Sequence, residues 1–166
     1  TVGWLDGTSE GEKNPGKYLD FLADKGAACL CIMPDRNWNI TDPEERELKV
    51  NKLYELVEHA KKIKMPVIAG TEMNKWGQKF VDDFFADAMK PVNPEFMEGS
   101  RILTGHTLVK KQLGWGISSE EAVEKFGDDL HRRNCFFEQA GHLQPAAQPS
   151  QVEHLKQKLE KMCHQA

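Results

Sequence analysis

The stretch MPVIAGTEMN, residues 65–74, decides the fold, because an apolar run of strand length ends there in polar side chains. Residues 65–70 are predicted to form a strand covered on both faces, since such strands read as continuous apolar runs. Glu72 and Asn74 follow where the run stops. The placement of a carboxylate and an amide at the end of a buried strand needs a reason.

Two earlier stretches show the same pattern of an apolar run followed by polar residues. Residues 2–5, VGWL, are predicted to form a short first strand. Residues 27–33, AACLCIM, are predicted to form a second strand that is buried on both faces. A polar loop follows each run, so the chain repeats the arrangement three times.

Helices are predicted in both gaps between these strands. Asn14 and Pro15 supply an N-cap and a first-turn proline for a helix that ends near residue 25. Asp42 and Pro43 open a longer helix with one apolar stripe, which marks the side that packs on the sheet. The alternation of strands and helices predicts parallel strands with crossover helices, and therefore an α/β fold that is TIM-barrel-like or a partial barrel.

The second half of the chain is predicted to be helical, because helix caps recur there and no further β-rich run follows. Residues 118–141 are predicted to form one helix. The expected organisation is an α/β domain over residues 1–141, a linker over 142–149 and an amphipathic helix over 150–166. The apolar face of that last helix is expected to dock on this domain or on a second subunit.

The charge balance disfavours a nucleic-acid or membrane partner. The 166 residues include 22 basic and 26 acidic ones, without a long block of one sign. No apolar run approaches the roughly 20 residues needed to cross a bilayer, so we expect a cytoplasmic protein. Cys29 and Cys31 have one residue between them, whereas zinc pairs use two, which favours free buried thiols.

The polar loops that follow parallel strands meet at one face of the sheet, where α/β proteins bind ligands. Carboxylates and an arginine at such a face suit a divalent metal or an oxygen-rich, acidic substrate. We therefore expect the side chains after the three strands to converge. The candidate residues are Asp6 and Glu10 after the first strand, Asp35, Arg36, Asn37 and Trp38 after the second, and Glu72 and Asn74 after the third.

Glu72 is the first candidate for chemistry, because it lies two residues beyond Gly70 at the end of the apolar run. Its carboxylate could ligate a metal or act as a general base with a pKa set by partial burial. The alternative is structural: Glu72 caps a nearby amide or pairs with Arg36.

The segment DRNWN, residues 35–39, combines charged groups with a tryptophan. The Arg36 guanidinium suits a carboxylate or phosphate, and the Trp38 ring suits stacking on a sugar. Asp35 is a candidate metal ligand and Asn37 a candidate substrate-binding group. The alternative is a turn in which Asp35 and Asn37 bond their own backbone.

His106 joins the same face only if residues 101–105, RILTG, form a fourth strand. In that case it is a metal ligand or an acid/base group. If these residues are helical, His106 is a local hydrogen-bonding group. The pattern leaves both possibilities open.

The run Ala69-Gly70-Thr71-Glu72 resembles the Gly-x-Glu element of polymerase-and-histidinol-phosphatase-type metal hydrolases, and the wider pattern is similar to the closing strands of an amidohydrolase-type (β/α) barrel. The resemblance implies a metal-bridging role for Glu72. The family's early His-x-His and late Asp-x-His motifs are missing from this sequence. The resemblance therefore implies the later part of a barrel, whose first ligands lie in a missing N-terminal half.

The leading hypothesis is a metal-dependent hydrolase or a fragment of one, acting on a small oxygen-rich substrate. A divalent zinc, manganese or magnesium ion is expected near Glu72, Asp35 and His106. One alternative is a non-catalytic carbohydrate- or small-acid-binding domain that uses Trp38, Arg36 and Asn39 without a metal. A third is a structural α/β module that forms homo-oligomers through its C-terminal helices.

Overall fold

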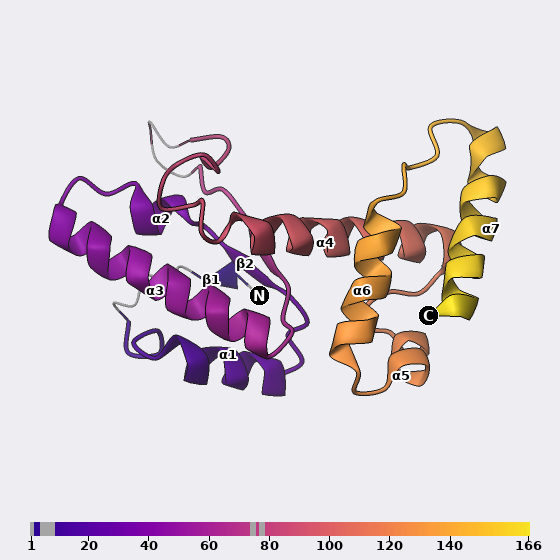
Figure 1. The fold of residues 1–166 in the computed structure, drawn as a ribbon, viewed down its shortest axis with the longest axis horizontal. Coiled ribbons are helices and arrows are strands. Elements are labelled where there is room, and N and C mark those ends of the chain that lie inside the picture. Colours follow the sequence, from indigo (N-terminus) through magenta and orange to yellow (C-terminus); the bar gives the residue numbers. More distant parts are fainter. Residues whose placement is uncertain (1, 4–8, 74–75, 77–78) are drawn as a thin grey trace. The chain divides into compact units, whose positions relative to one another are not determined.

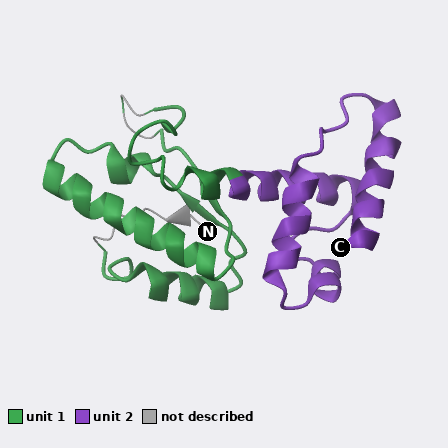
Figure 2. Cartoon of the chain, in the orientation of Figure 1, with its two compact units in different colours: residues 1–97 green, residues 98–166 purple. Residues whose placement is uncertain are grey.

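A computed structural model describes residues 2–3, 9–73, 76 and 79–166 of the chain. The chain divides into two compact units, unit 1 over residues 1–97 and unit 2 over residues 98–166 (Figure 2). Unit 1 holds the strands, whereas the described elements of unit 2 are helical. No helix in the described ranges is long and apolar enough to span a bilayer.

The sheet of unit 1 consists of three short parallel strands in the order of the chain (Figure 1). They are β1 (Val2–Gly3), β2 (Leu30–Ile32) and β3 (Val67–Ala69). The predicted parallel α/β arrangement is confirmed. In the described part of the chain the sheet is open and does not close into a barrel.

The crossover helices α1 (Pro15–Asp24) and α3 (Pro43–Lys62) begin where the caps predict. The side chains of Asn14 and Asp42 each accept a backbone N–H of the first helical turn, at 3.1 and 2.8 Å. These bonds satisfy amides that have no partner within the helix, and each such cap stabilises a helix by about 1 kcal/mol.

One core lies between these helices and one face of the sheet. The side chains of Leu30 and Ile32 are fully buried, whereas Cys31 between them is only half-buried. Among the described residues, the core covers the face of the second strand that carries Leu30 and Ile32, whereas the predicted cover of the opposite face, which carries Cys31, is only partial. Cys29 and Cys31 are thiols outside any disulfide, and burial raises the pKa of each. The main core residues of α1, α3 and β3 are Leu19, Leu22, Leu53, Leu56, Val57, Ala60 and Val67.

Two segments differ from the sequence interpretation. Residues Asp35–Trp38 form a single helical turn, α2, where a loop was expected. Residues 101–105 are helical, because they lie inside α4 (Asn93–Leu113). The buried positions Ile102, Gly105 and Val109 recur at intervals of three and four, which is the period of a helix and not of a strand.

Unit 2 is built on the later part of α4 together with α5 (Glu120–Phe126), α6 (Leu130–Gly141) and α7 (Pro149–Gln165). The helix predicted over 118–141 is divided at Gly127, whose φ of 55° favours glycine. The apolar face of α7 docks inside this unit. The core residues are Ile102, Leu108, Val109, Ala122, Phe126, Phe136, Phe137, Ala140, Leu155 and Leu159.

The predicted domain boundary at residue 141 differs from the division between the units, which falls within α4 at residues 97 and 98. The cause is that the apolar side chains after residue 98 form a second core with α5, α6 and α7. A periodic helical sequence gives no local sign of a change of core, because both halves of α4 carry buried apolar positions.

Two helices of unit 2, α4 and α6, meet at glycines. A Cβ added to Gly105 would lie 1.8 Å from the backbone oxygen of Phe137. A Cβ added to Gly141 would lie 2.0 Å from the backbone oxygen of Arg101. Both distances are far inside van der Waals contact, so no other residue fits either position without a shift of the backbone.

Candidate functional site

The candidate site lies at the carboxyl ends of β2 and β3 in unit 1. Asp35 and Arg36 begin α2 shortly after β2, and Glu72 follows β3. The Arg36 guanidinium donates to the Glu72 carboxylate, and their side chains are 19% and 22% exposed. The expected convergence of the second and third strand ends is therefore present in this pair, as is the pairing that the sequence left open.

The carboxyl group of Asp35, next to Arg36 in the chain, has a raised pKa. Burial raises the pKa of its carboxyl group above the ordinary value, and the neighbouring Glu72 charge raises it further. The Arg36 charge, the Arg36 backbone N–H and the Lys79 charge act in the opposite direction without reversing the shift. A carboxyl group in such surroundings is suited to proton transfer.

Asp82 is a buried carboxylate that the sequence analysis did not select. Its residue is 6% exposed, and its Oδ1 accepts a hydrogen bond of 2.9 Å from Trp38 Nε1. Its Oδ2 is buried and has no hydrogen-bond partner among the described residues. Burial raises the pKa of Asp82, and the charge of Asp35 contributes to the same shift.

The sequence offered no signal for this position, because the run FVDDFF reads as an amphipathic segment with its aspartates in water. Asp83, the next residue, fits that reading, since it is only partly buried and accepts the backbone N–H of Phe85 at 3.0 Å.

Trp38 is fixed from two sides. The Trp38 indole N–H donates to Asp82 on one side. On the other, Lys79 Nζ lies 4.6 Å from the centroid of the Trp38 ring, within the range of a cation–π contact. Lys79 is a second group that the sequence analysis did not select. The ring that was expected to stack on a sugar thus has a cation over it in the described structure.

The remaining predicted substrate-binding residues are less central. Asn37 is fully buried, and its Nδ2 donates to the backbone oxygen of Lys49 at 3.0 Å, so it fastens α2 to α3 in place of the predicted ligand contact. Glu10 is exposed and pairs with Lys13 at 2.6 Å. Asp6 and Asn74 lie outside the described residues.

His106 is a local hydrogen-bonding group of unit 2 and not a residue at a strand end. It lies on α4, and its Nδ1 accepts the backbone N–H of Ile117 at 3.0 Å. Burial lowers the pKa of the imidazole, and the charge of Lys110 lowers it further. Both effects favour the neutral ring that this hydrogen bond requires.

The described residues do not by themselves form the expected metal centre. Across the described ranges, no group of three or more histidine, cysteine, aspartate and glutamate side chains is placed to hold a metal ion. Glu72 is bound to a guanidinium, and His106 has its partner in unit 2. Asp35 and Glu72 therefore supply fewer ligands than a metal site uses.

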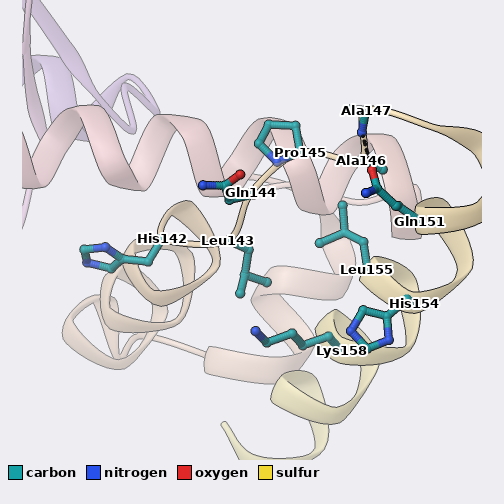
Figure 3. A pocket seen from close by; sticks show the side chains of 10 residues that line it. All are labelled: His142, Leu143, Gln144, Pro145, Ala146, Ala147, Gln151, His154, Leu155 and Lys158. Carbon is teal, nitrogen blue, oxygen red and sulfur yellow. Dashed lines mark hydrogen bonds between the residues drawn. The ribbon is translucent and has the colours of Figure 1, made fainter.

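A cavity in unit 2 offers a second concave surface, with a volume of ≈ 400 Å³ (Figure 3). Its histidines, His142 and His154, lie at opposite sides of the opening and do not point to a common position. Gln151 closes one wall, because its side-chain oxygen accepts the backbone N–H of Ala147 at 2.9 Å. The arrangement shows no convergent set of reactive groups.

Comparison of the chain with protein-family models, with curated proteins and with solved structures finds no match. The assignment of a function therefore depends on the geometry of unit 1.

Proposed function

We propose that unit 1 carries the substrate-binding face of a hydrolase-like α/β enzyme that acts on a small, oxygen-rich, acidic substrate. The single observation that carries the proposal is the Arg36–Glu72 pair beside the half-buried Asp35, all three at the carboxyl ends of β2 and β3. Ligands of α/β proteins bind at this end of the sheet.

Each of the three residues has a separate role in the proposal. Arg36 binds a carboxylate or phosphate oxygen of the substrate, because its planar guanidinium offers several donors in fixed directions. Glu72 orients that guanidinium through their ion pair. Asp35 transfers a proton, since burial holds its pKa above the ordinary value of an aspartate.

The sheet is further proposed to be part of a (β/α) barrel. This part of the proposal is supported by the three parallel strands that follow one another in chain order, as neighbouring strands of such a barrel do. The half-buried Cys31, on the strand face opposite the core, also suits a sheet that needs cover on both faces.

A zinc, manganese or magnesium centre, which the resemblance implies, would need ligands beyond Asp35 and Glu72. In this proposal Arg36, Glu72 and Asp35 therefore act without a metal. An added metal is treated as one arm of the experiment.

The experiment compares melting temperatures of the purified chain with phosphate, tartrate, zinc, manganese or magnesium. We expect phosphate or tartrate to raise the melting temperature of the wild type, because binding to the folded state stabilises it. Arg36→Gln should lose this rise. Arg101→Gln is the matched control, because Arg101 forms a similar half-exposed pair with Glu138 at 2.9 Å in unit 2.

Turnover is tested on chromogenic phosphate and carboxylate esters. Under the proposal, Asp35→Asn abolishes hydrolysis and keeps the anion-induced rise in melting temperature. A protein that neither anions nor metals stabilise, and that hydrolyses none of these esters, would contradict the proposed function.

The second candidate function is non-catalytic binding of a small acid. It is favoured by the charge balance of the Arg36–Glu72 pair, which is complete without a metal. Anion binding that depends on Arg36, without turnover of any ester, would support this candidate over the enzyme.

A further inference from the structure

A cavity in unit 1 runs along one side of α3 and has a volume of ≈ 660 Å³. This volume is in the usual range for small-molecule sites, which is about 300–1,000 Å³. We call it the α3 groove. It is lined by Trp38, Pro43, Arg46, Glu47, Val50, Tyr54, Ala86, Asp87 and Ala88.

The long wall of the α3 groove is one face of the helix. Arg46, Val50 and Tyr54 are spaced by four residues, so their side chains lie above one another along α3. The opposite wall is the segment Ala86–Ala88, which follows the candidate site in sequence. The groove therefore has a charged end at Arg46 and an apolar, aromatic end at Tyr54.

The aromatic side chains of the groove have their polar atoms bound inside the protein. The Tyr54 hydroxyl donates to the backbone oxygen of Ala88 at 2.9 Å, and the Trp38 Nε1 donates to Asp82 at 2.9 Å. Both side chains are half-buried. The Tyr54 ring therefore offers carbon to a ligand, which suits a flat apolar group, whereas the Trp38 ring already has Lys79 Nζ at 4.6 Å from its centroid.

The charged side chains at the groove remain available to a ligand. Within the described residues, neither the Arg46 guanidinium nor the Glu47 carboxylate forms an ion pair or a side-chain hydrogen bond, and both residues are exposed. Asp87, by contrast, is already paired with Lys90 at 2.7 Å. The α3 groove thus combines one available cation, one available anion and a small apolar surface.

We propose that the α3 groove binds a free α-amino acid with a flat, apolar side chain. Arg46 receives the carboxylate in a forked pair, Glu47 accepts from the ammonium group, and the side chain lies along Val50 and the Tyr54 ring. This combination explains both charges, whereas a simple anion would leave Glu47 without a role and would be repelled by it. The site is separate from the proposed hydrolase site, because neither Arg46 nor Glu47 takes part in that site.

The test uses three probes in a titration followed by backbone and indole N–H resonances: L-phenylalanine, phenylacetate and phenethylamine. Phenylacetate lacks the ammonium group and phenethylamine lacks the carboxylate. We expect L-phenylalanine to shift the resonances of Trp38, Val50 and Tyr54, and to bind about 5–10-fold more tightly than either analogue.

Variants separate the two charges. Arg46→Gln should weaken the binding of L-phenylalanine and phenylacetate by about 5–10-fold and leave the binding of phenethylamine unchanged. Glu47→Gln should weaken the binding of L-phenylalanine and phenethylamine. The binding of phenylacetate should be unchanged or tighter. Glu44→Gln is the matched control on the same helix, since Glu44 is exposed and does not line the groove.

Arg36→Gln tests the independence of the two sites, because it should remove anion stabilisation and leave L-phenylalanine binding intact. Arg46 and Glu47 are exposed, so their variants should keep the wild-type circular dichroism spectrum. Three results would overturn the proposal: no shift at the groove in millimolar L-phenylalanine, equal binding of the three probes, or binding that Arg46→Gln and Glu47→Gln leave unchanged.

Discussion

The Arg36 guanidinium donates to the Glu72 carboxylate and so joins two segments that are 36 residues apart in sequence. Arg36 belongs to the helical turn after β2, and Glu72 to the segment after β3. The contact fixes the carboxyl ends of two neighbouring parallel strands to each other, and the proposed proton donor Asp35 lies next to it in the chain.

The first prediction concerns the strength of this pair. Glu72→Gln should lower the free energy of unfolding of unit 1 by about 1–3 kcal/mol, which is the range for a hydrogen bond to a charged group. The measurement is urea denaturation of the wild type, Glu72→Gln, Arg36→Gln and the double variant. The expected coupling is positive, so the double variant should lose less than the sum of the single losses. Additive losses would show that the pair contributes no stability of its own.

The second prediction follows from the burial of Asp82. Because the pKa of Asp82 is raised in the folded state, the folded protein binds this proton more tightly than the unfolded chain does. The stability contribution of Asp82 therefore falls as pH rises from the ordinary pKa of aspartate, near 3.8, through the raised pKa of Asp82 in the folded state. Asp82→Asn keeps an oxygen for the Trp38 indole and should gain stability relative to the wild type as pH rises from 4 to 7.

The measurement is the free energy of unfolding of both proteins across that range. Asp83→Asn is the control, because Asp83 is only partly buried. A difference between Asp82→Asn and the wild type that is constant with pH would contradict the account of Asp82.

The third prediction concerns acid sensitivity in unit 2. The pKa of His106 is lowered in the folded state, and its neutral Nδ1 accepts the Ile117 N–H. The stability that His106 provides is complete above the ordinary histidine pKa of about 6.5. It is lost as pH falls through 6.5 toward the lower pKa of His106 in the folded state. His106→Gln should therefore flatten the loss of stability of unit 2 between pH 7 and 5.

Resonances of α5 and α6 can follow the unfolding of unit 2 across this pH range. His154→Gln is the control, because His154 is exposed on α7. If the acid-induced loss is the same in His106→Gln as in the wild type, another group is responsible.

The fourth prediction concerns the wall of the α3 groove. Tyr54→Phe removes the hydrogen bond to the Ala88 oxygen and should lower the free energy of unfolding by about 1 kcal/mol. Tyr18→Phe is the matched control, because no hydrogen bond of the Tyr18 hydroxyl to a described residue is found. The two variants can be compared by chemical denaturation, and equal losses would argue against a structural role for the Tyr54 hydroxyl.

The starts of the crossover helices could be predicted from the sequence because a helix cap is a local signal. Asn14 and Asp42 lie directly before a proline, and each acts within one turn of its own position. The parallel sheet could be predicted for a related reason, since apolar runs that alternate with such helices leave few topologies.

The candidate site was only partly predictable, because its members meet through the fold. Arg36 and Glu72 were selected as residues at strand ends, and the structure brings them together. Asp82 was missed because its hydrogen-bond partner, Trp38, is 44 residues earlier in the chain. The role of His106 stayed open in the sequence, since the five residues 101–105, RILTG, are too few to distinguish the strand period from the helix period.

The glycine contacts of unit 2 limit how that unit can change. Gly105 and Gly141 place the backbone of each helix against its neighbour, so the crossing of α4 and α6 is set by main-chain atoms. Outward-facing side chains of α6 can be exchanged without moving the point at which the two helices cross. A methyl group at either glycine would instead act as a spacer that separates the helices and loosens the aromatic packing around Phe137.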